Sequence, residues 1–189
     1  MKALKNFEKT INAFPEKNKI TSLLLQVPPE NSLEAQLILI KNLTTRGFRV
    51  IILSGGRPCK DLLSICEEKK IEIKNIRIID MICRSQHLNV KDTEFVTHMN
   101  SIQSLTEISI LLSKIAVPKK TVLFIDSITS MLIYNDERIF TRFLSEVVQK
   151  MKTREIHLIL LLIKTKNYDN LRAELKYLCD QEMTFNEKE

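Results

Sequence analysis

Residues 121–132 read Thr121-Val122-Leu123-Phe124-Ile125-Asp126-Ser127-Ile128-Thr129-Ser130-Met131-Leu132. The continuous apolar start of this stretch lacks the polar alternation of a half-exposed strand, so it predicts a strand buried on both faces of a parallel sheet. An aspartate and small polar residues end the run. Parallel sheets carry their binding sites at the carboxyl ends of their strands. We therefore expect Asp126 and Ser127 to lie at the functional edge of the sheet.

Similar strands alternate with helices on both sides of this segment. Apolar runs predict strands at 21–27, 48–53, 76–81, 121–126 and 155–163, and an edge strand at 182–185. Helical spacing predicts helices over 33–46, 60–70, 101–115, 138–152 and 167–178, with 83–99 as a surface loop. A further amphipathic helix is expected within 1–19, packed on the domain or on a partner. The alternation predicts one α/β domain over 1–189, a three-layer sandwich with a mostly parallel central sheet.

The loop after the first strand has a composition that disfavours phosphate. It reads Val27-Pro28-Pro29-Glu30-Asn31-Ser32-Leu33-Glu34, and the glycines of the chain, Gly47, Gly55 and Gly56, all lie elsewhere. A phosphate-binding loop needs glycines so that consecutive backbone N–H groups can surround the phosphate, and a lysine to neutralise its charge. The two prolines instead remove two N–H donors.

The helix that follows this loop has its own start signal. Asn31 or Ser32 is expected as the N-cap, and Glu34 stands three residues after Asn31 in a capping-box arrangement. Gly47 marks the C-terminal end. Because Glu30 and Glu34 place negative charge at the helix N-terminus, where an anion would otherwise be favoured, we expect phosphate to be repelled.

Composition limits the classes of partner. The chain carries a formal net charge of +6 and a pI of about 9.1, but its lysines are spread along the sequence, and it has no tryptophan. A nucleic-acid partner is therefore left open with weak support. No apolar run approaches the roughly 20 residues of a membrane-spanning helix, and the N-terminus lacks the apolar core of a secretory signal. We expect a cytoplasmic protein without a membrane segment.

The cysteines and histidines show no metal-binding spacing. There is no C-x-x-C pair and no adjacent histidine pair among Cys59, Cys66, Cys83, Cys179, His87, His98 and His157. Zinc sites that are recognisable in sequence carry such pairs. We expect buried or idle thiols, no disulfide framework and no metal centre.

The order of these parts resembles the RecA-like ATPase superfamily, most closely its KaiC-like branch, which is widespread in archaea. Residues 122–132 look like the Walker B strand and turn of that family, with Asp126 as the matching acid that orders Mg²⁺ through water. Residues 50–63, the stretch 134–144 and the tripeptide Leu178-Cys179-Asp180 are similar to further family segments. The likeness covers roughly residues 20–186 and implies a P-loop NTPase fold.

Departures from that family concentrate at the chemistry. Ser32 falls within a residue or two of the family's lysine, and Leu33 falls near its Mg²⁺-binding Ser/Thr. Gly55 and Gly56 stand where the family carries an acid that activates the attacking water, and a general base must be a titratable group. The resemblance thus implies a protein without catalytic residues, and ATP and Mg²⁺ are not expected as cofactors. Asp126 is then a strand-end cap for the turn at Ser127 and Thr129, in which Ser127 forms the turn and is no nucleophile.

Three functions remain open at this stage. The first is a catalytically inactive pseudo-ATPase that acts as a regulatory or assembly module, by self-association or with a protein partner. Arg57, Arg138 and Arg142 could contribute to its interface, or they could be solvated helix residues. The second is a weak ATPase or ATP-binding sensor that uses Asp126 and the 28–32 loop. The third is a DNA- or RNA-binding accessory protein of the recombination type.

Overall fold

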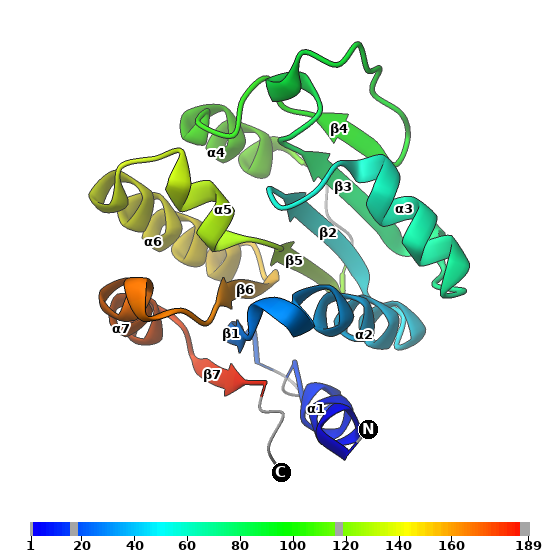
Figure 1. Cartoon of the computed structure of the whole chain (residues 1–189), viewed down its shortest axis with the longest axis vertical. Coiled ribbons are helices and arrows are strands. Elements are labelled where there is room, and N and C mark those ends of the chain that lie inside the picture. The colour runs from blue at the N-terminus through cyan, green and yellow to red at the C-terminus, as the bar shows by residue number, and fades with distance from the viewer. Residues whose placement is uncertain (1, 16–18, 116–118, 186–189) are drawn as a thin grey trace.

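Seven parallel strands form one central sheet in the computed structural model, which describes residues 2–15, 19–115 and 119–185 (Figure 1). The strands lie in the order β4-β3-β2-β5-β6-β1-β7, and every strand pair among the described residues is parallel. Their bounds are β1 Ser22–Val27, β2 Arg49–Ser54, β3 Ile76–Asp80, β4 Val96–His98, β5 Thr121–Ile125, β6 His157–Ile163 and β7 Gln181–Thr184. The predicted α/β architecture with a mostly parallel sheet is confirmed.

Helices cover both faces of the sheet and complete three layers (Figure 1). On one face pack α1 (Lys2–Asn12), α2 (Ser32–Thr45) and α3 (Cys59–Glu68). On the other face pack α4 (Leu105–Lys114), α5 (Ile128–Ile133), α6 (Glu137–Thr153) and α7 (Asp169–Leu178). Side chains of a strand alternate between its two faces, and in β1 the buried Leu24 and Leu25 accordingly belong to opposite core clusters.

The N-terminal helix packs on the domain itself. Phe7, Ile11 and Phe14 are buried in the core cluster that also holds α2, and the ring of Phe7 lies 5.0 Å from that of Phe185 in an edge-to-face arrangement. Of the two expectations for this helix, packing on the domain is confirmed. The part of the expected 1–19 segment at 16–18 lies outside the described residues.

Two elements were missing from the sequence prediction. The stretch 83–99, expected as a loop, contains the edge strand β4 and the short 3-10 turn Arg84–Gln86. The residues after β5 form α5, where the sequence predicted only a turn. Among the described residues, no helix is both long and apolar enough to cross a membrane.

Candidate functional site

The carboxyl end of β5 meets the carboxyl end of β2, and Asp126 stands at this junction. Its backbone N–H donates to Leu53 O at 3.2 Å, which continues the pairing of the two strands. Its carboxylate accepts from Gly55 N at 2.9 Å through Oδ1 and from Ser54 Oγ at 2.7 Å through Oδ2. Asp126 therefore fastens the turn after β2 to the end of β5.

Burial sets the charge behaviour of this carboxyl group. Asp126 is 1% exposed, and loss of solvation raises its pKa to about 6. Hydrogen bonds from Gly55, Ser54 and Gly56, and the positive charge of Arg57, act in the opposite direction and limit the rise in pKa. A protein carboxylate that orders Mg²⁺ needs free oxygen lone pairs. Both oxygens of Asp126 already accept hydrogen bonds from the protein.

Asp126 caps a different turn from the one expected. The sequence predicted a cap for the turn at Ser127 and Thr129, but the partners of Asp126 come from the turn after β2. Ser127 itself is the N-cap of α5, where its Oγ accepts from Ser130 N at 3.1 Å. Thr129 Oγ1 accepts from Ile163 N at the end of β6. The expected turn-forming role of Ser127 agrees with this geometry.

The 28–33 loop closes on itself between β1 and α2. Pro29–Asn31 form a 3-10 turn in which Asn31 N donates to Pro28 O and Ser32 N donates to Pro29 O. Pro28 and Pro29 carry no N–H group. Of the residues from Pro28 to Ser32, only Glu30 therefore keeps a backbone N–H that is not used or missing in these ways.

The expected capping box is wrong. Asn31 is the N-cap of α2, but its side chain makes no capping hydrogen bond, because the preceding 3-10 turn supplies backbone acceptors instead. Two buried acceptors, Asn31 Oδ1 and Gln36 Oε1, have no hydrogen-bond partner among the described residues. Gln36 is 3% exposed, and its Nε2 donates to the backbone O of Asp126 at 3.3 Å. Unpaired acceptors do not attract phosphate, since a phosphate requires donors.

The turn after β2 has no room for an acidic side chain at Gly55. A Cβ atom there would lie 2.9 Å from Met81 Cε and 3.2 Å from Met131 Cγ. At Gly56 a Cβ would lie 3.3 Å from Ser127 Cβ. The absence of an acid in this turn is therefore supported by the packing around it.

The three arginines expected at an interface occupy two different environments. Arg138 and Arg142 are exposed on α6, where Arg142 pairs with Glu146 one turn later. Arg57 is half-buried, and its charge lowers the pKa of Asp126. Its Nε is buried without a hydrogen-bond partner among the described residues. Arg57 thus belongs to the surroundings of Asp126, whereas the α6 pair lies at the surface.

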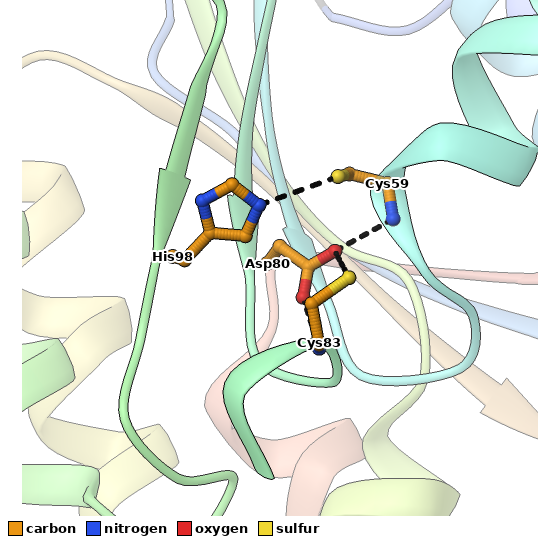
Figure 2. Close-up of side chains that lie close together, drawn as sticks. All are labelled: Cys59, Asp80, Cys83 and His98. Carbon is orange, nitrogen blue, oxygen red and sulfur yellow. Dashed lines mark hydrogen bonds between the residues drawn. The ribbon is translucent and has the colours of Figure 1, made fainter. Parts of the chain in front are cut away.

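A second cluster, which the sequence did not predict, lies at the same edge of the sheet on the β3–β4 side. Figure 2 shows the side chains of Cys59, Asp80, Cys83 and His98 converging from α3, β3, the turn after β3, and β4. One potential ligand atom from each lies within 4.8 Å of the others, and all four residues are buried. The absence of metal-binding spacing among the histidines and cysteines holds along the sequence, but as a statement about their positions in space it is wrong.

Asp80 organises this cluster. Its Oδ1 accepts from Ile82 N and Cys83 N, both at 2.8 Å, and its Oδ2 accepts from Cys59 N at 2.6 Å. These bonds lower the pKa of the carboxyl group against the opposing effect of burial, which is the largest single influence. The neighbouring thiols respond in the opposite direction, and burial together with Asp80 raises the pKa of Cys59 to about 12.

Comparisons with known proteins identify the fold and nothing finer. No protein-family model matches this sequence, and no curated protein matches it. Among solved structures, the chain is similar to one described as the ATPase domain of a RecA-like helicase, with a TM-score of 0.52 and 14% identity, over 87% of this chain and 68% of that chain. At this identity the likeness shows the fold alone. The chain has a RecA-like P-loop ATPase fold.

Proposed function

We propose that this chain is a RecA-like domain of the KaiC-like type, with a degenerate Walker A loop, that does not hydrolyse ATP and acts through contacts with other proteins. One observation carries the proposal: the carboxylate of Asp126 is buried and already bonded to Ser54 and Gly55. In an active relative this group would be free to order Mg²⁺. The closed 28–33 loop and the packed Gly55 support the same conclusion from independent parts of the site.

An exposed apolar surface supports the assembly role. Ile110 on α4, Tyr134 after α5 and Ile139 on α6 line one surface hollow and are 49%, 53% and 63% exposed. Large apolar side chains gathered at one place on a surface commonly mark a protein contact site. Arg138 and Arg142 lie on the same helix as Ile139. We name Ile110, Tyr134 and Ile139 the α4–α6 surface and propose it as the contact surface.

We expect Ile139→Arg to weaken self-association, or binding to a protein partner, at least tenfold. Placing a guanidinium at the centre of an apolar contact desolvates a charge without a partner. Sedimentation velocity over a range of concentrations measures self-association, and affinity capture followed by mass spectrometry detects another partner. Tyr177→Arg is the matched control, because Tyr177 is 91% exposed on α7, outside this surface. The assembly role is rejected if the wild-type chain stays monomeric at high concentration and captures nothing that Ile139→Arg loses.

A further inference from the structure

The four buried side chains at the β3–β4 end of the sheet have the composition of a zinc site. Two thiols, an imidazole and a carboxylate are the donor groups that Zn²⁺ takes in proteins, and four protein ligands without an open position are typical of structural sites. We propose that Cys59, Asp80, Cys83 and His98 bind one Zn²⁺ ion through Sγ, Oδ2, Sγ and Nε2.

The spacing of the donor atoms is close to that of a tetrahedron. Zinc bonds of about 2.3 Å to sulfur and about 2.0 Å to nitrogen or oxygen place neighbouring ligand atoms about 3.5 Å apart, and two sulfurs about 3.8 Å apart. Cys59 Sγ lies 3.6 Å from His98 Nε2, and Cys83 Sγ lies 3.3 Å from Asp80 Oδ2 (Figure 2). The widest separation, under 4.8 Å, closes to a tetrahedral edge by a shift of about 1 Å.

The orientation of His98 provides an independent argument. Its Nδ1 lies 3.0 Å from Asp92 Oδ1, and a carboxylate can only accept, so Nδ1 carries the proton and Nε2 presents a lone pair to the cluster. Asp92 is held in turn by Arg84 at 3.1 Å, and Arg84 also donates to the backbone O of His98. A histidine that donates its outer N–H to a carboxylate is the usual arrangement around protein-bound zinc.

The protons of the cluster match the charge of the ion. With Nε2 unprotonated, the Cys59 thiol donates to His98, and the Cys83 thiol donates to Asp80. Zn²⁺ would displace these two thiol protons and use the same lone pairs, so the net charge of the buried cluster would stay unchanged. The second lone pair of Asp80 Oδ2 remains bonded to Cys59 N, which keeps the carboxylate in place.

Zinc bound here would join segments that are weakly connected otherwise. β4 is a three-residue edge strand that pairs with β3 alone, and Asp80 and His98 are partners in that pairing. The ion would fasten the end of β4 and the turn at Cys83 to the start of α3. Its role would be structural and separate from Asp126, so it does not depend on the proposed function.

Metal content and cobalt substitution test the site directly. We expect the purified full chain to contain about one equivalent of zinc by elemental mass spectrometry. After the protein is stripped with a chelator under reducing conditions, CoCl₂ should produce thiolate-to-cobalt absorption and the visible bands of tetrahedral Co²⁺. Adding ZnCl₂ to the stripped protein should release about two protons per ion and raise Tm by about 5–15 °C.

Variants distinguish this cluster from other thiols. Cys83→Ser and His98→Gln should lose the cobalt thiolate spectrum or weaken zinc binding at least 100-fold. Cys66→Ser is the matched control, since Cys66 is a buried thiol of α3 outside the cluster, and it should bind like the wild type. The proposal is overturned if stripped wild-type protein shows no cobalt spectrum and no Tm shift with ZnCl₂. It is also overturned if Cys59 and Cys83 are recovered as a disulfide under reducing conditions, or if Cys66→Ser loses as much binding as Cys83→Ser.

Discussion

Gly55→Glu is expected to destabilise the protein by about 4 kcal/mol or more, because the new side chain would overpack the turn and bury a second carboxylate beside Asp126. Its Cβ would lie 2.9 Å from Met81 Cε and 3.2 Å from Met131 Cγ, and Gly55 N already contacts Asp126 Oδ1 at 2.9 Å. The φ of Gly55 lies outside the left-handed region, so the cost comes from space and charge instead of backbone strain. Urea unfolding followed by circular dichroism measures the loss.

Two companion variants separate the causes. Gly55→Ala adds the crowding alone and should cost about 1–2 kcal/mol. Lys60→Glu adds an acid at an exposed position near the same turn and should change stability by less than about 0.5 kcal/mol. If Gly55→Glu were as stable as the wild type, the turn would have room for a catalytic acid, and packing would no longer explain its absence.

Asp126→Asn should remove a pH dependence from the stability of the fold. The pKa of Asp126 is about 6 in the folded protein, against an ordinary value of 3.8, so the folded state binds the proton more tightly than the unfolded state. Wild-type stability relative to Asp126→Asn should therefore rise as pH falls from about 7 to about 4. The shift in pKa corresponds to a gain on the order of 3 kcal/mol.

The comparison isolates Asp126 from other titrating groups. Burial lowers the pKa of His157, and this effect decreases stability as pH falls in both proteins alike. Urea unfolding of wild type and Asp126→Asn at several pH values between about 4 and 8, with and without MgCl₂, gives the difference curve. A difference that does not vary with pH contradicts the assigned pKa. A wild-type stability gain with MgCl₂ that Asp126→Asn lacks would indicate that Asp126 takes part in Mg²⁺ binding.

Periodicity was sufficient for most of the fold because the long elements bury whole faces. The apolar run at 155–163 predicted β6, and the stripe on 138–152 predicted α6. β4 was missed because it is three residues long and is defined by pairing with β3, which no local pattern announces. The capping box failed because Pro28 and Pro29 favour a 3-10 turn that supplies backbone acceptors before Asn31 is reached.

The candidate sites were predicted unevenly for the same physical reason. Asp126 could be found because it follows an apolar strand directly. The four-residue cluster could not be found from cysteine spacing, since Cys59 and His98 are brought together by strand order alone. A usable signal did exist: Asp80 and His98 each end a parallel strand, and such ends meet at one edge of the sheet.

Titration with Mg-ATP tests the central claim most directly. The account predicts that millimolar Mg-ATP leaves Tm where MgCl₂ and sodium sulfate of equal ionic strength leave it. A ligand at about 100 times its Kd stabilises the folded state by about 2.7 kcal/mol. For a domain of this size that corresponds to a rise in Tm of about 5–10 °C. A saturable rise of that kind, specific to nucleotide, would contradict the account and identify the chain as a nucleotide-binding protein.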